Sequence, residues 1–109
     1  MLNSNQKIIM QNFLKEIVNS EYYKAHETVE AIWFPVRFDK NNIKVKIFKG
    51  FINSAVSLRL VQLGKVKQSK KPFNTFLKYS KFIKKENRYL LNLRNIIINT
   101  YFKNIKGKK

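Results

Sequence analysis

Apolar side chains recur every three or four residues through most of the chain, which is the spacing of amphipathic helices. The first such segment covers about residues 5–18. We expect Ser20 to cap a second helix that begins at Glu21, since a serine oxygen accepts from free amides at a helix start. That helix must end near Pro35, because the residue before a proline is displaced from the α region. Residues 38–42 then form a loop.

The next segment is ambiguous at its start. Residues 43–47 alternate between apolar side chains and lysine, and this pattern alone is typical of a short strand. The apolar positions continue at helical spacing as far as Leu60, however. We therefore predict a third helix over about residues 42–63, which ends at Gly64 as the residue after the C-cap.

Two more helices complete the prediction. The fourth covers about residues 70–85, with Pro72 in its first turn, where the missing amide hydrogen costs little. The fifth covers residues 88–105. Three glycines and two prolines are too few for an all-β domain, which needs frequent turns. The sequence therefore predicts one all-α domain over residues 1–109, a small bundle of about five helices in which the second and third form a central antiparallel hairpin.

Composition agrees with one folded unit. A chain of 109 residues with 44% apolar and 14% aromatic residues can bury a core, and it is too short for two domains. The absence of cysteine excludes disulfides, thiolate metal sites and cysteine nucleophiles. No apolar stretch reaches the roughly 18 residues of a membrane span, and the first residues do not resemble a secretion signal. We expect a cytoplasmic protein without a membrane span.

The predicted second helix carries the candidate site for chemistry. Its positions 23, 26, 30 and 33 share one face, which places a histidine and a glutamate within an aromatic stripe. Such polar groups must find partners or line a cleft. The candidate ligand-binding residues are Tyr23, His26, Glu30, Trp33 and, from the third helix, Asn53.

Several roles remain open for this group. His26, Glu27 and Glu30 are the candidate catalytic residues, with Glu30 orienting His26 for acid–base chemistry. Zinc held by histidines is disfavoured because the chain has one histidine. An oxygen-rich cation site with Glu27, Glu30 and Asp39 is an alternative. In the simplest interpretation, His26, Glu30 and Asn53 or a lysine form a buried network that sets the helix register, with no metal or cofactor.

The same residues resemble a known family. The chain is similar to the small bacterial proteins of domain of unknown function 309 over about residues 12–80. The similarity rests on Glu21-Tyr22-Tyr23-x-Ala25-His26-Glu27-x-Val29-Glu30-x-x-Trp33, on Phe48-x-Gly50-Phe51-Ile52-x-x-Ala55, and on Gly64. It implies an all-α bundle with His26 and Glu30 directed toward the third helix, and it brings no activity. The chain departs from the family at Asn53, where a glutamine is expected, at Lys44 or Lys46, where an arginine is expected, and in its lysine-rich segment after Gly64.

The net charge of +17 suggests a polyanionic partner. AT-rich coding also raises lysine content, so the distribution of charge is more informative than its total. After residue 64 there are many basic residues and one acid, Glu86. Lysines at helical spacing form a candidate polyanion-binding face there, around Asn74. They are Lys67, Lys71, Lys78, Lys81 and Lys85.

Two hypotheses of function follow. The first is a non-enzymatic binding or interaction protein whose second half contacts nucleic acid or an acidic protein, with lysines positioned on phosphates rather than reading bases. The alternative is a small enzyme, or a ligand- or metal-binding bundle, that uses the His26-Glu27-x-x-Glu30 helix. The apolar stripe of the fifth helix also allows a homodimer.

Overall fold

The computed structural model describes residues 2–107 and consists of five α-helices. They are α1 (Ser4–Val18), α2 (Tyr22–Trp33), α3 (Ile43–Gln62), α4 (Val66–Ser80) and α5 (Arg88–Lys106), with a short 3-10 helix, η1 (Phe34–Val36), after α2. The described residues contain no strand. The all-α prediction is therefore confirmed, and residues 43–47 begin a helix despite their alternating pattern.

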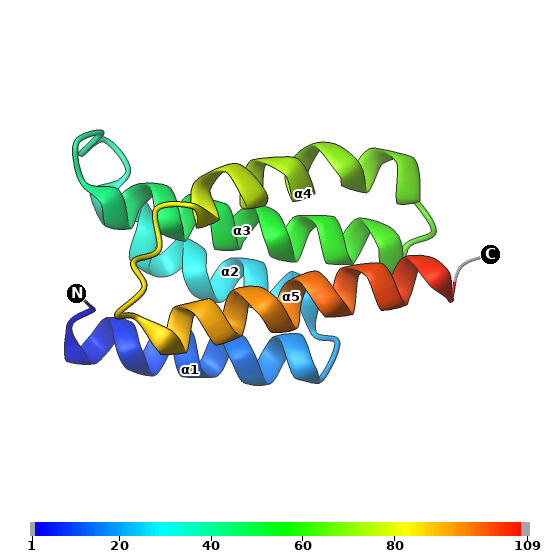
Figure 1. Cartoon of the computed structure of the whole chain (residues 1–109), viewed down its shortest axis with the longest axis horizontal. Helices are drawn as coiled ribbons and strands as arrows, with labels where there is room; N and C mark the ends of the chain where they lie inside the picture. Colours follow the sequence, from blue (N-terminus) through cyan, green and yellow to red (C-terminus); the bar gives the residue numbers. More distant parts are fainter. Residues whose placement is uncertain (1, 108–109) are drawn as a thin grey trace.

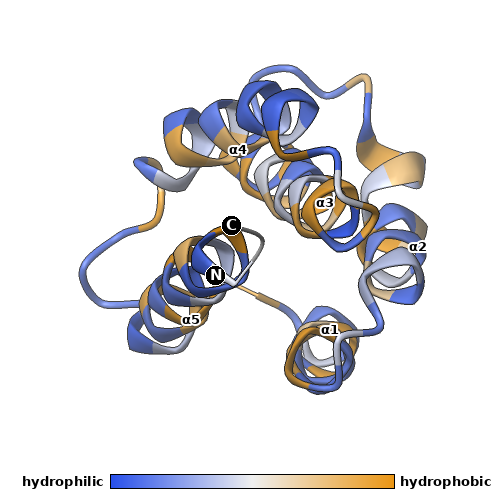
Figure 2. Ribbon diagram, turned by 90° about the vertical axis from the view of Figure 1, so that its right-hand side faces the viewer, coloured by the Kyte–Doolittle hydropathy of each residue, from blue (hydrophilic) through white to orange (hydrophobic). Residues whose placement is uncertain are grey.

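Successive helices run in opposite directions along the long axis of the molecule (Figure 1). Seen from the end, α1, α2, α3 and α4 follow one another in an arc, and α5 lies on the open side of that arc (Figure 2). The central α3 packs against α2, α4 and α5. The predicted hairpin of α2 and α3 is thus present, and α5 closes the core that the first four helices share. Within residues 2–107 none of the helices combines the length and the apolar character that crossing a bilayer requires.

Aromatic rings fill the centre of the bundle. Phe51 of α3 contacts Phe13 of α1 and Phe76 of α4, with ring centroids 5.7 Å and 5.8 Å apart. Phe73 of α4 stacks on Tyr101 of α5 at 3.7 Å. Edge-on and tilted ring pairs such as the two of Phe51 add about 0.5–1.5 kcal/mol to the effect of apolar burial. These ring contacts therefore join α1 and α4 to α3, and α5 to α4.

Hydrogen bonds also fix α5 to three other helices. The Tyr101 hydroxyl lies 2.8 Å from the Ser69 hydroxyl on α4, and the Asn104 amide donates to the Tyr22 hydroxyl on α2 at 3.0 Å. Tyr89 donates to the backbone carbonyl of Met10 on α1 at 3.4 Å. The apolar stripe that suggested a homodimer is therefore covered in part within the same chain, while Ile96 and Phe102 stay 36% and 57% exposed. Its buried residues are Leu90, Leu93, Ile97 and Tyr101.

The end of α3 is formed as the sequence predicts. Gly64 has a φ of 79°, in the left-handed region that glycine enters without steric cost. Its amide donates to the carbonyl of Val61 at 2.9 Å, and the next amide, of Lys65, donates to Leu60 at 2.8 Å. These two bonds form a Schellman motif, which satisfies carbonyls that the helix end leaves free.

Ser20 does not cap α2, and that prediction is wrong. Ser20 has a φ of 61°, and the amide after it, of Glu21, donates to the carbonyl of Glu16 at 2.8 Å. Ser20 therefore ends α1 in the way that Gly64 ends α3. Glu21 is the N-cap of α2 and makes no side-chain capping bond. Because the link between α1 and α2 is short, the chain must reverse its direction at Ser20. Ser20 therefore cannot adopt the extended backbone conformation that an N-cap residue needs.

Replacing Ser20 by glycine is expected to raise the free energy of unfolding by about 0.5–1 kcal/mol. A side chain in the left-handed region costs roughly 1–2 kcal/mol, which glycine would avoid. Glycine also has more conformational freedom in the unfolded chain, and the loss of that freedom on folding cancels part of the gain. Ser20→Ala is the matched control, because it also removes the hydroxyl but keeps the Cβ atom, and it should not stabilise. Urea denaturation followed by circular dichroism compares the two. A Ser20→Gly protein no more stable than Ser20→Ala would contradict this explanation.

The position of α4 also differs from the prediction. The helix begins at Val66 rather than near residue 70 and ends at Ser80 rather than near residue 85, so Pro72 lies inside it. Proline cannot donate to the carbonyl four residues earlier, which destabilises a helix. The cost is offset by Ser69 and Phe73, which are buried against Tyr101 of α5. Packing against α5, which the local pattern does not reveal, extends the helix toward its N-terminus.

Candidate functional site

The predicted polar pair on α2 is present. The Nε2 atom of His26 lies 3.1 Å from Oε2 of Glu30, one turn later on the same helix. The side chain of His26 is 28% exposed and that of Glu30 is 46% exposed, so the pair lies at the surface and not in a buried network. The Tyr23 ring lies 6.1 Å from the imidazole, centroid to centroid, and is also exposed. Three of the predicted residues therefore share one surface.

This pair borders a shallow hollow between α2 and α3. The cavity has a volume of about 180 Å³, below the roughly 300 Å³ at which ligand pockets usually begin. Tyr23 and His26 line it from α2, and Val56, Arg59 and Leu60 are among the residues that line it from α3. The carboxylate can fix the orientation of the imidazole. The hollow beside them offers little space for a substrate.

The other candidate residues of this group do not form a hydrogen-bonded network with His26 and Glu30. The side-chain amide of Asn53 donates to the backbone carbonyl of Lys49, one turn earlier on α3, at 2.9 Å. The indole nitrogen of Trp33 is buried without a hydrogen-bond partner. Glu27 is exposed, and within residues 2–107 no three acidic or histidine side chains gather as a ligand set. The alternative of a cation held by Glu27, Glu30 and Asp39 is therefore not realised.

The lysine face follows the outer side of α4. Lys67, Lys71 and Lys78 are exposed, on the side of the helix opposite the buried Phe73 and Phe76. The predicted continuation of this face is wrong, because α4 ends at Ser80. Lys81 is the C-cap residue and Lys85 lies in the turn before α5, both exposed. We use the name α4 lysine face for Lys67, Lys71 and Lys78 only.

Carboxylates do not neutralise this face. In the described part of the chain, the one basic side chain within 4.0 Å of a carboxylate is His26, beside Glu30. The sequence has no acidic residue between Asp39 and Glu86 and none after Glu86. Consequently α3, α4 and α5 contain no acid, whereas α1 and α2 contain Glu16, Glu27 and Glu30. The positive charge is therefore concentrated on the side of the bundle built from the last three helices.

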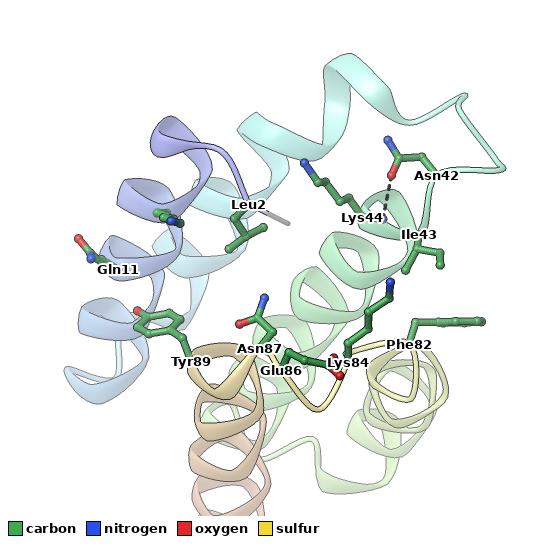
Figure 3. A pocket seen from close by; sticks show the side chains of 11 residues that line it. Leu2, Gln11, Asn42, Ile43, Lys44, Phe82, Lys84, Glu86, Asn87 and Tyr89 are labelled. Carbon is green, nitrogen blue, oxygen red and sulfur yellow. Dashed lines mark hydrogen bonds between the residues drawn. The ribbon is translucent and has the colours of Figure 1, made fainter.

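Sequence reasoning missed a large cavity. A cleft of about 820 Å³ lies at the end of the bundle where α1, α3 and α5 begin (Figure 3). It includes three lysines that are far apart in the sequence, Lys7, Lys44 and Lys84. No local motif joins them, and only the antiparallel order of the helices brings them to one end.

Comparison with known proteins gives one match. A family model described as "Domain of unknown function (DUF309)" matches residues 10–71. The match includes the α2 pair and the first part of α4, with Lys67 and Lys71, and it stops before Lys78 and α5. No curated protein and no solved structure matches the chain.

Proposed function

The chain belongs to the DUF309 family, whose description gives no activity, and from its own residues we propose that it binds the phosphate backbone of nucleic acid through the α4 lysine face. The observation that carries this proposal is a row of exposed lysines without carboxylate partners, on a side of the bundle that contains no acid. Like charges at helical spacing repel one another. An anionic partner would remove that repulsion.

The dimensions of the face suit an extended polyanion. Lys67 and Lys78 are eleven residues apart, which is about 16 Å along a helix at 1.5 Å per residue. One strand of a duplex advances about 3.4 Å per phosphate, so this length corresponds to roughly five phosphates. Lys81 and Lys85 extend the positive surface beyond the end of the helix. A single small anion could not use all of these charges.

The side chains of the face favour binding that is independent of base sequence. Lysine contacts phosphates as a point charge, whereas base edges are read mainly by arginine, asparagine and glutamine. On the exposed side of α4 only Gln68 and Asn74 belong to the second group. We therefore expect DNA duplexes of different sequence to bind with similar affinity.

The test replaces Lys67, Lys71 and Lys78 together by glutamine. Binding is measured by the fluorescence anisotropy of a short fluorescein-labelled DNA duplex at about 0.1 M salt. At this salt concentration, charge interactions extend roughly 10 Å. The matched control replaces Lys15, Lys24 and Lys40, which are exposed on other elements and lower the net charge equally. The α4 variant is expected to bind at least tenfold more weakly than the wild type. The control should lie within about twofold of the wild type.

Other outcomes would contradict the proposal. If both triple variants lose affinity equally, binding reflects net charge and not the α4 lysine face. If wild-type protein binds polyglutamate but no duplex, the partner is an acidic protein. His26→Ala should leave duplex binding unchanged, since the α2 pair lies on a separate helix from the face. Loss of binding in His26→Ala alone would favour a site on α2.

A further inference from the structure

The cleft at the end of the bundle is built from three separate segments. Leu2, Lys7 and Gln11 line it from the start of the chain, and Asn42, Ile43 and Lys44 from the start of α3. The third segment runs from the turn after α4 into the first turn of α5 and supplies Phe82, Lys84, Glu86, Asn87 and Tyr89. In Figure 3, Leu2 and Asn87 lie between α1 and α3, and Lys84 lies nearer to Ile43 and Phe82. The volume of the cleft, about 820 Å³, lies in the range of roughly 300–1,000 Å³ that is common for small-molecule sites.

Three lysines are among the residues that line this cleft. Lys7, Lys44 and Lys84 line it, and Glu86 is the one acid among the lining residues. None of these lysines lies within 4.0 Å of a carboxylate in the described residues, and Lys44 donates to the amide oxygen of Gln6 at 3.3 Å. Like charges that line the same cleft from different segments repel one another. A bound anion would offset this repulsion.

The direction of the helices reinforces the charge of the lysines. α1, α3 and α5 all begin at this end of the molecule (Figure 1). The start of a helix carries a partial positive charge, and three starts at the same end of the bundle add to the potential of the three amines. The caps Asn3, Asn42 and Asn87 occupy some of the free amides. The helices therefore contribute mainly through their dipoles, and the lysines supply the groups that would contact a ligand.

The walls of the cleft are mostly apolar. Ile43 is 43% exposed and Phe82 is 39% exposed, which leaves apolar surface in contact with water. Leu2 and Tyr89 add to the same walls, and burial raises the pKa of the Tyr89 phenol. A simple inorganic ion would leave this surface uncovered, whereas an anion with an apolar part would cover it. The cleft thus fits a ligand with two chemical parts.

We propose that this cleft binds a small organic anion, with the anionic group on Lys7, Lys44 and Lys84 and the apolar part against Ile43 and Phe82. The site uses none of the lysines of the α4 lysine face. Failure of one proposal therefore leaves the other intact.

Anilinonaphthalene sulfonate is a suitable probe, because it joins a negative charge to an aromatic body and fluoresces when its water is removed. We expect one molecule to bind per chain. A variant with Lys7, Lys44 and Lys84 replaced by glutamine should bind it at least tenfold more weakly. The matched control replaces Lys15, Lys49 and Lys103, which are exposed on α1, α3 and α5 outside the cleft. It should bind within twofold of the wild type.

Two further measurements keep the test decisive if a triple variant is poorly folded. Uncharged N-phenylnaphthylamine should bind the wild-type protein at least tenfold more weakly than the sulfonate, because it lacks the group that the lysines hold. Octanoate added to wild-type protein should displace the probe and shift the backbone amide signals of Lys7, Asn42 and Asn87 in NMR spectra. Equal binding of the charged and neutral probes would overturn the proposal. Amide shifts confined to other parts of the bundle would overturn it as well.

Discussion

Replacing Phe51 by alanine is expected to lower the free energy of unfolding by about 4 kcal/mol, within the 3–5 kcal/mol typical of a buried phenylalanine. The side chain is 1% exposed and joins three helices, because its ring contacts Phe13 of α1 and Phe76 of α4. Alanine would remove both ring contacts and leave a cavity that the surrounding helices can close only in part. Guanidinium denaturation followed by circular dichroism measures the change.

Phe38→Ala is the matched control for this prediction. Phe38 is 78% exposed, and its ring contacts the guanidinium group of Arg37 at 4.4 Å from the centroid. We expect a change below about 1 kcal/mol for this substitution. If Phe51→Ala does not fold, Phe51→Leu keeps part of the volume and should still be clearly less stable than the wild type. If Phe51→Ala lowers the free energy of unfolding no more than Phe38→Ala does, the result would contradict the described core.

Replacing Gly50 by leucine is expected to lower the free energy of unfolding by about 3 kcal/mol, at the upper end of the usual cost of overpacking. A Cβ atom on Gly50 would lie 3.0 Å from the Cβ atom of Tyr79 and 3.7 Å from the carbonyl oxygen of Phe76. The nearest atom is the rigid base of a side chain, so the backbone of α4 must move away from α3. In an open helix the same change would be stabilising, since glycine is a poor helix former.

Gly107→Leu provides the control for the same substitution. There a Cβ atom would meet only the carbonyl oxygens of Asn104 and Lys103, at 3.6 Å and 3.7 Å, and Gly107 has an ordinary φ of −71°. We expect its effect to stay within about 0.5 kcal/mol. Thermal unfolding of the two variants beside the wild type makes the comparison. Equal stability of the two would show that α3 and α4 do not approach as closely as described.

Much of the fold could be predicted from the sequence because most helices have one continuous apolar side. The C-terminal glycine of α3 was also recognisable, since Gly64 directly follows the last apolar turn. Ser20 was misinterpreted because serine is common at helix starts, whereas here it adopts the left-handed conformation that ends α1. The start of α4 was missed because Ser69, a polar residue, is buried by its bond to Tyr101 of α5. The first error concerns a backbone conformation, and the second concerns a contact that the local pattern does not contain.

The candidate sites, too, could be predicted only where their residues lie within one helix. Helical spacing was sufficient to place His26 beside Glu30 and to align Lys67, Lys71 and Lys78, because each set lies within one helix. Spacing could not show that Asn53 bonds to its own helix. The end cleft could not be foreseen at all, since its lysines come from three segments and meet through the antiparallel order of the bundle. Local chemistry is readable from the sequence, and assembled sites require the fold.

The role of the α4 lysine face is tested most directly by the salt dependence of duplex binding. Each phosphate that a protein neutralises contributes about 0.9 to the slope of log affinity against log salt concentration. Replacing Lys67, Lys71 and Lys78 by glutamine should therefore reduce the slope by about 2.7 if all three contact phosphates. The control with Lys15, Lys24 and Lys40 replaced should keep the wild-type slope. Equal slopes for the wild type and the α4 variant would contradict the proposed function.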